Sequence, residues 1–184
     1  MPETVTRNLP VLALRGVTAF PGQTVSFDVE REISIYALDN AMESDRRIFA
    51  ITQKELSTSE PGERDLYAVG TVCHILQIVK TSDTTVRVVV EGESRARLLR
   101  LWQTQPFLQG QAELLPEQPA RSTARTEALL RRTYVLFDDY RQLASGLSDD
   151  FTAAVLDCRD AGELADLIAQ NITLRHQDRQ RVLE

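Results

Sequence analysis

The chain has few of the side chains that bind metal ions or form cross-links. Its two cysteines, Cys73 and Cys158, lie in a strand-like and a helix-like segment, and its two histidines, His74 and His176, are equally isolated. Structural metal sites need several such ligands at short spacing, so we predict no metal site. The cysteines are expected to be reduced core residues, and the histidines to be structural or exposed.

An excess of positive charge is also missing. The net charge is -6 at pH 7. Before residue 118 there are 12 Lys and Arg against 16 Asp and Glu, and after it 9 against 11, so neither half is basic. Dedicated nucleic-acid binders neutralise phosphates with clustered Lys and Arg. The acidic balance therefore disfavours nucleic acid as a partner.

The motifs of nucleotide binding and hydrolysis are missing as well. The eight glycines form no phosphate-binding loop, so we predict no ATP site in this chain. The two lysines, Lys54 and Lys80, lie at a loop and at a hairpin end, where solvation keeps them from activating a serine. Adjacent acids such as Asp138 and Asp139 point in different directions on a helix. We therefore predict no catalytic residues and no cofactor in this chain.

Long apolar runs are absent too. No stretch approaches the ~20 apolar residues that span a bilayer, and the polar start lacks the basic and apolar regions of a secretory signal. We therefore expect a cytoplasmic protein that does not enter a membrane. With 42% hydrophobic residues, the chain is able to bury a core without disulfides.

What the first part of the chain does contain is an alternation with a period of two, which is typical of strands. The expected strands are Leu9–Arg15, Val25–Val29, Ile48–Gln53, Gly70–Lys80, Thr85–Glu91, Arg95–Trp102 and Leu108–Leu114. One helix, capped by Ser34 and running to Met42, interrupts them. We predict a small β-barrel over residues 1–117, because closure removes exposed strand edges.

After Pro116 and Pro119 the periodicity becomes helical, and residues 118–184 are predicted to form a helical bundle. The first helix is expected to bury one stripe, widened by Leu130 and Phe137 and consisting of Leu129, Thr133, Leu136, Tyr140 and Leu143. The expected caps of the next three helices are Ser148, Asp160 and Thr173. The last helix meets no stop signal before Glu184, which predicts that the bundle is truncated.

Three sequence blocks occur in a specific order. They are the strand and turn formed by Leu9–Arg15 and Phe20-Pro21-Gly22, the block Asp65–Val72, and the pattern Val88, Val90, Glu91, Gly92, Arg95 and Ala96. Between them lie an Arg31-Glu32 junction and a strand that ends in Gln53. In this combination the chain resembles the N-terminal substrate-binding domain of bacterial Lon-type ATP-dependent serine proteases over nearly its whole length.

The resemblance implies an α+β fold, in which a PUA-like β pseudo-barrel with one helix precedes an α-helical bundle. It also implies a domain that recognises misfolded, regulatory or degron-bearing proteins and helps to arrange a homohexamer. By the same resemblance this chain is not an enzyme. The ATPase module, with its ATP and Mg²⁺, and the Ser-Lys protease module belong to the parent hydrolase and are absent from this sequence.

The predicted substrate-binding surface joins a turn to the entrance of a helix. It consists of Phe20, Pro21, Gln23, Thr24, Arg31, Glu32, Ile33 and Tyr36. Misfolded chains expose apolar segments and strand edges, which a small barrel binds by burial in a groove or by strand addition. A structural interpretation stays open for two of these residues, since Phe20 is suited to filling the barrel and Ile33 to stapling the helix entrance.

Two other functions stay open at this point. One is a free-standing Lon-domain adaptor without protease modules, against which the unfinished last helix argues. The other is a PUA-like nucleic-acid-binding module, which the acidity disfavours. The chain also departs from the family pattern twice. Asp83-Thr84 replaces a common Asp-Gly and predicts a wider hairpin loop, and Gln23-Thr24 replaces an apolar pair and predicts a weaker apolar contact surface.

Overall fold

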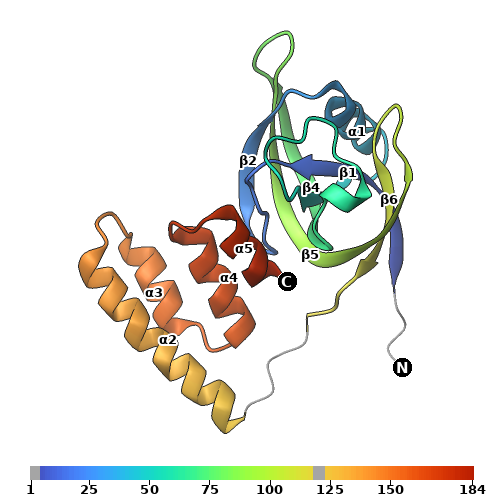
Figure 1. Ribbon diagram of the computed structural model, residues 1–184. Coiled ribbons are helices and arrows are strands. Elements are labelled where there is room, and N and C mark those ends of the chain that lie inside the picture. Colours follow the sequence, from blue (N-terminus) through green and yellow to red (C-terminus); the bar gives the residue numbers. More distant parts are fainter. Residues whose placement is uncertain (1–4, 118–122) are drawn as a thin grey trace. The chain divides into compact units, whose positions relative to one another are not determined.

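The computed structural model describes residues 5–117 and 123–184, which divide into two compact units (Figure 1). The barrel unit contains the described residues up to 117 together with Arg175–Glu184. The helical unit contains the residues from 123 to Leu174. The sequence predicts a single bundle over 118–184, whereas the structure groups the end of that segment with the barrel.

The elements of the barrel unit are β1 (Thr6–Leu14), β2 (Thr24–Val29), α1 (Glu32–Met42), β3 (Arg47–Thr52), the 3₁₀ turn η1 (Glu63–Asp65), β4 (Val69–Lys80), β5 (Val86–Gln103), β6 (Gln109–Leu114) and α5 (His176–Leu183). The strands form one sheet in the order β2-β5-β4-β3-β1-β6, and β5 also pairs with β6. This extra pairing closes five strands into a barrel and leaves β2 as an extension on β5 (Figure 1). The predicted small barrel with one helix is confirmed.

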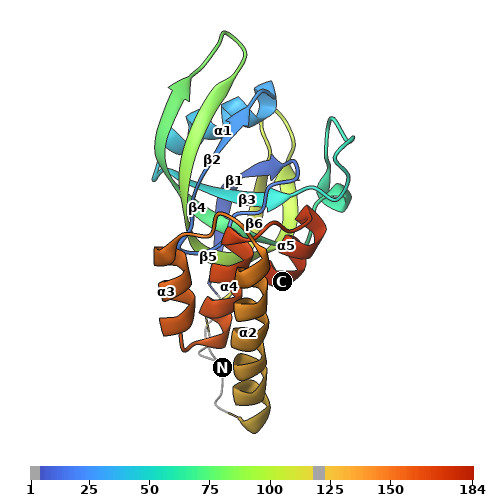
Figure 2. The ribbon, with the colours of Figure 1, turned by 90° about the vertical axis from the view of Figure 1, so that its left-hand side faces the viewer.

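One long strand, β5, belongs both to the closed barrel and to the extension formed by β2. Its first part pairs with β2 over Val86–Glu91, and its last part pairs with β6 over Ala96–Gln103. Register shifts against β4 bend the pair, as β-bulges do. The sequence predicts two strands here, but the structure has one, because Gly92 stays in the ladder opposite Cys73. The β4–β5 hairpin projects from the barrel (Figure 2). Thr81 N donates to Thr85 O at 3.0 Å and closes its loop. The loop has five residues, so it is wide, as the sequence predicts.

The Phe20-Pro21-Gly22 turn docks on the middle of β5 through main-chain hydrogen bonds. Gly22 N donates to Gly92 O at 2.9 Å, and Gly92 N donates to Gln23 O at 2.9 Å. A Cβ atom on Gly92 would lie 2.1 Å from the carbonyl oxygen of Phe20, so only glycine allows this approach. The Thr71 hydroxyl donates to Ala19 O at 2.7 Å. The three sequence blocks therefore meet at one place in the fold.

From Leu9 onwards, strand β1 is buried on both faces and separates two core clusters. Leu12 and Leu14 pack with Leu38 and Ala41 of α1 in the first cluster, which also contains Ile48, Ile75, Val88 and Val90. Leu9, Val11 and Ala13 face the second cluster, with Phe49, Ile51, Leu66, Ala96 and Ala112. Full burial of a large apolar side chain contributes about 1.5–3 kcal/mol, so β1 links most of the apolar stabilisation of the unit.

Helix α1 begins three residues earlier than the sequence predicts. Its N-cap is Arg31, and Ser34, the predicted cap, lies buried in the first turn with its main-chain N donating to Arg31 O at 2.9 Å. The cap prediction at Ser34 is therefore wrong. The early start turns Ile33 towards the second core cluster, where it packs partly buried. Tertiary packing outweighs the local capping preference here.

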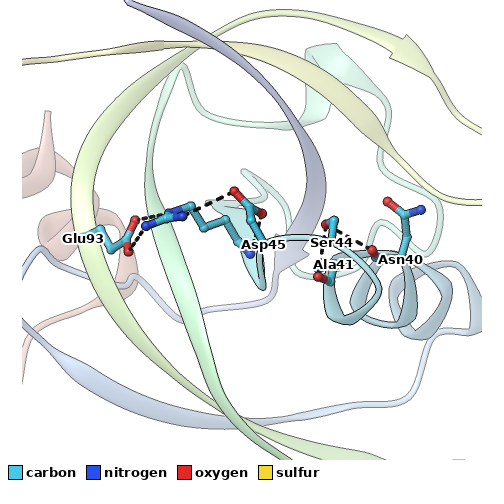
Figure 3. Close-up of polar contacts among 6 residues, drawn as sticks. Asn40, Ala41, Ser44, Asp45 and Glu93 are labelled. Carbon is cyan, nitrogen blue, oxygen red and sulfur yellow. Dashed lines mark hydrogen bonds and ion pairs between the residues drawn. The ribbon is translucent and has the colours of Figure 1, made fainter.

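An ion-pair cluster ties the turn between α1 and β3 to β5 (Figure 3). The Arg47 guanidinium donates to both carboxylate oxygens of Glu93, at 2.7 and 3.0 Å, and lies 3.4 Å from Asp45. The hydrogen bonds that Arg47 donates to Glu93 raise the pKa of Arg47 above its usual value. Since Glu93 follows Gly92, the same part of β5 holds both this turn and the Phe20 turn.

Helix α5 is held on the barrel by two bonds to its strands. The Gln180 amide donates to Val69 O at 2.9 Å, and the Arg95 guanidinium donates to Leu183 O at 2.9 Å. Gln180 and Leu183 are both buried. The N-cap of this helix is Arg175, so the predicted cap at Thr173 is wrong.

The helical unit consists of α2 (Ala124–Leu143), α3 (Asp149–Asp157) and α4 (Ala161–Asn171), which lie side by side (Figure 1). Its core contains Phe137, Phe151, Val155 and Leu164, and the two rings meet edge to face with centroids 5.6 Å apart. The predicted caps of α3 and α4 are confirmed, since Ser148 accepts from Phe151 N and Asp160 accepts from Gly162 N and Glu163 N.

The buried stripe predicted for α2 is wrong in its main line, although Leu130 and Phe137, the residues that widen it, do pack in the core. The face that packs on α3 and α4 consists of Leu130, Tyr134 and Phe137, whereas Leu129, Leu136 and Leu143 are 56%, 54% and 89% exposed. The reason is that α2 carries two apolar stripes side by side. Two short helices cover one of them, and periodicity alone does not distinguish the covered stripe from the uncovered one.

We expect Gly92→Ala to destabilise the protein by about 2–3 kcal/mol, because the new Cβ overlaps the carbonyl oxygen of Phe20 and separates the turn from β5. Urea unfolding followed by circular dichroism measures the loss. The matched control is Gly62→Ala, where the nearest atom to the new Cβ is 3.7 Å away and stability should change by less than about 0.5 kcal/mol. Equal stability of the two variants would contradict the docking account.

Burial raises the pKa of the Cys73 thiol to about 12. In the native protein at pH 8, about one Cys73 in ten thousand is therefore a thiolate, and iodoacetamide should modify the half-buried Cys158 first. Because the unfolded thiol ionises near pH 8.5–9 and the native one does not, stability should fall as the pH rises from about 9 towards 12. Mass spectrometry of the alkylated chain measures the order of reaction. Equal native rates for both thiols would contradict the burial of Cys73.

Candidate functional site

A groove lies in the barrel unit between the end of β1 and strand β2. It has a volume of about 240 Å³. Its floor is apolar and its rim is polar: Leu12, Leu14, Val17, Phe27 and Val29 line the floor, and Arg15, Asp28, Glu30 and Arg31 stand at the rim. Drug-sized ligands occupy about 300–1,000 Å³, so this space suits one or two side chains of a longer segment.

Main-chain edges border the groove on two sides. Among the described strands, β2 pairs with β5 alone, so its other edge is open along Thr24–Val29. Strand β1 pairs with β6 over Thr6–Pro10 and with β3 over Val11–Leu14, which leaves the groove side of its last residues without a strand neighbour in this part of the chain. Open edges of this kind accept an added strand.

Arg31 closes one end of the groove. Its guanidinium donates to the Gln53 side chain at 2.6 Å and lies 3.5 Å from Ala13 O and 3.4 Å from Thr58 O. Gln53 is fully buried, and its amide donates to Glu55 O at 2.5 Å. The pKa of Arg31 is lowered below its usual value, mainly by burial and to a lesser extent by the positive charge of Arg15. The arginine nevertheless stays charged at neutral pH.

An exposed ion pair stabilises β2 at the rim. The Arg87 guanidinium donates to both carboxylate oxygens of Asp28, at 2.8 and 2.9 Å. These hydrogen bonds hold the pKa of Asp28 below its usual value. The pair joins β2 to β5 and balances the negative charge of Asp28 at the groove.

The sequence-predicted site residues lie in three places. Arg31 is at the groove, while the turn from Phe20 to Thr24 lies at the opposite end of β2, which at about 3.3 Å per residue is roughly 20 Å away. Phe20 is completely buried, and its main-chain N donates to the side-chain oxygen of Gln23 at 3.2 Å, while Pro21 is half-buried and Thr24 is exposed. The side chain of Phe20 is thus a core residue.

The remaining predicted residues lie on α1. Tyr36 is 45% exposed, and its hydroxyl donates to the exposed Glu32 carboxylate at 3.1 Å. Ile33 packs against the second core cluster and forms part of the entrance to the helix. The sequence did not predict the groove itself, nor that the buried Gln53 accepts a hydrogen bond from Arg31. The available signal was that Gln53, at the end of a strand, and Arg31, before the helix, are both motif positions.

These features define a binding domain: a small barrel with a groove bordered by main-chain edges, accompanied by a helical unit. The chain belongs to the family of ATP-dependent protease La (LON) substrate-binding domains, whose family model matches residues 8–184.

Relatives and solved structures agree with the family. The chain is 35% identical over 184 residues to Lon protease 1 of Bacillus subtilis, covering 100% of this chain and 24% of that protein, and 39% identical over 178 residues to Lon protease of Syntrophomonas wolfei, covering 97% and 22%. The chain therefore spans about a quarter of the length of these relatives.

Two solved structures share the fold. The N-terminal domain of Mycobacterium avium complex Lon protease matches with a TM-score of 0.52 at 20% identity, covering 96% of each chain. The Lon N-terminal domain protein from Xanthomonas campestris matches with a TM-score of 0.60 at 14% identity, covering 97% of this chain and 90% of that one. In the described ranges, no helix is long and apolar enough to cross a membrane.

We expect Arg31→Ala to lower the free energy of unfolding by about 1–3 kcal/mol, because the buried Gln53 oxygen loses its donor. Arg31→Lys should restore little of this loss, since an ammonium group lacks the fork that reaches several oxygens. Thermal and urea unfolding measure both. Arg15→Ala, an exposed arginine at the same groove, is the control and should change stability by less than about 0.5 kcal/mol. A similar loss in both alanine variants would contradict the bridging role.

Proposed function

We propose that this chain is the substrate-recognition domain of an ATP-dependent Lon protease, and that the groove between β1 and β2 binds extended segments of unfolded or degron-bearing proteins. The family and the names of the relatives support the first part of the proposal. The open strand edges beside an apolar floor are the observation that carries the second part.

Recognition by this groove uses two features that every unfolded chain has. An extended segment offers main-chain N–H and C=O groups to the edge of β2 or β1, and its alternate side chains enter the apolar floor. Main-chain bonding is independent of side-chain identity, so many sequences bind. The floor adds a preference for apolar residues, which folded proteins keep buried.

The polar rim selects for orientation rather than for net charge. Arg15 and Arg31 stand on one side with Asp28 and Glu30 close by, so the rim carries both signs. Asp28 is already paired with Arg87. A strongly acidic or basic segment therefore gains little at this site, which fits a domain that accepts diverse misfolded and regulatory proteins.

We propose two further contact sites for the substrate, the exposed pair Glu32 and Tyr36 on α1 and the turn at Gln23 and Thr24, and together we call them the second surface. They stay predicted binding residues. The turn is roughly 10 Å along β2 from Phe27, the nearest groove residue on that strand, so an extended segment of about three residues spans the distance. Variants at Gln23 and Tyr36 separate this surface from the groove.

We place the activities of the parent protein outside this chain. In the proposed full-length protein, ATP and Mg²⁺ drive unfolding, a Ser-Lys dyad cleaves the substrate, and homohexamer assembly encloses the chamber. The proposed setting is the cytoplasm. This chain supplies recognition and part of the assembly.

We expect the chain to bind reduced and alkylated lactalbumin, which is unfolded, at least about tenfold more tightly than folded lactalbumin in fluorescence anisotropy. Val17→Lys places a charge in the groove and should weaken binding about tenfold. Val79→Lys, an exposed valine of the β4–β5 hairpin, is the matched control and should bind like the unchanged chain.

The backbone contribution is measured with a short apolar peptide and the same peptide methylated on alternate main-chain nitrogens. Methylation removes the donors that strand addition needs and should abolish binding. Unchanged binding of the methylated peptide would reject strand addition. Loss of binding in Gln23→Ala or Tyr36→Ala but not in Val17→Lys would move the site to the second surface.

A further inference from the structure

Helix α2 exposes an apolar stripe that the helical unit leaves uncovered. Leu129, Leu136 and Leu143 are 56%, 54% and 89% exposed. We call these three residues the leucine stripe. They are seven residues apart, so they lie in one line along the helix, and Tyr140, which is 37% exposed, borders them. Three leucines in line on an exposed helix face are typical of a surface that packs against another helix.

Two opposite charges flank the leucine stripe at the same spacing. Arg132 and Asp139 are also seven residues apart, and each follows a leucine of the stripe by three positions, so both lie on the same side of it. Both side chains are exposed. Within residues 5–117 and 123–184, neither one forms a salt bridge, whereas Asp138 and Arg141 on the same helix pair with each other at 2.6 Å.

The order of these residues makes the stripe and its two charges complementary to a second copy of α2 that runs in the opposite direction. When two α2 helices pack antiparallel about a twofold axis at Leu136, Leu129 of one copy lies beside Leu143 of the second copy. The same axis brings Arg132 of each copy next to Asp139 of the other, because the two pairs of positions share their centre to within one residue. The apolar and the ionic contacts therefore form in a single register.

We infer that the leucine stripe is a self-association surface, on which a second copy of this chain packs with its α2 antiparallel. A parallel pairing would bring each Arg132 to the level of the other Arg132 and would offer no opposite charge. A C₂ contact must be complementary to itself, and an antiparallel stripe with one arginine and one aspartate meets this condition. The surface belongs to the helical unit, so the inference does not depend on the groove in the barrel unit.

The interface is short, so the dimer is weak and its population depends on concentration. Sedimentation equilibrium of the whole chain, from the micromolar to the millimolar range, should show a monomer–dimer equilibrium. Leu136→Lys should raise the dissociation constant at least about tenfold, because each dimer contains the substitution twice at its centre. Leu156→Lys, at an exposed leucine of α3, is the matched control and should leave it within about twofold.

The register is measured by exchanging the charges. Arg132→Glu alone and Asp139→Arg alone each place like charges side by side, so each should weaken the dimer by about three- to tenfold. The double variant, R132E with D139R, should recover most of the loss, and low salt should enlarge the effects. Arg131→Glu makes the same charge change on the opposite side of the helix and should have little effect.

Circular dichroism should show that each variant keeps its helices, because all the altered side chains are exposed. A chain that stays monomeric at millimolar concentration would overturn the inference. Dimers that survive Leu136→Lys would also overturn it, and failure of the double variant to recover would reject the antiparallel register. A monomer that binds unfolded lactalbumin through Leu136 would assign the stripe to substrates instead. Loss of substrate binding in Val17→Lys with dimerisation intact separates this surface from the groove.

Discussion

The contact between the Phe20 carbonyl oxygen and Gly92 is the constraint on which the barrel depends. It places the turn before β2 against the middle of β5, and a Cβ atom at Gly92 would lie 2.1 Å from that oxygen. The turn directs β2 along the first part of β5, while Glu93, the next residue, holds the turn between α1 and β3 through Arg47. Gly92 therefore sets the position of the Phe20 turn and of the strand that borders the groove, and its neighbour Glu93 holds the second turn.

The groove follows from how the barrel closes. Strand β6 pairs with the last part of β5, so β2 is left on the first part, outside the closed circle. The end of β1 then faces β2 across a space instead of pairing with it, and Arg31 spans from the helix entrance to Gln53 and Ala13 at its end. The bent β5 thus shapes both the core and the proposed binding groove, because β2 pairs with β5 on one side and keeps its other edge open.

Much of this fold was predictable from local patterns. Alternation located the strands, Ser148 and Asp160 marked two helix starts, and the ordered motifs indicated the family. The failures share a cause. Ser34 is a good cap by composition, but α1 begins earlier so that Ile33 reaches the core. The stripe through Leu129 and Leu136 is as regular as the one through Leu130 and Phe137, and only the packing of α3 and α4 selects between them. The groove was missed because its walls are separated in sequence.

The amino-acid sequence by itself determined the family, the strand segments and the positions of the glycine, arginine and glutamine that the fold uses. Periodicity and turn chemistry are local properties, so they are visible in a single sequence. The tertiary structure decided which strand edges stay open, which apolar face of α2 is covered, and that Gly92 receives the Phe20 turn. These outcomes depend on competition between distant segments for the same neighbours, and no local pattern records the result of that competition.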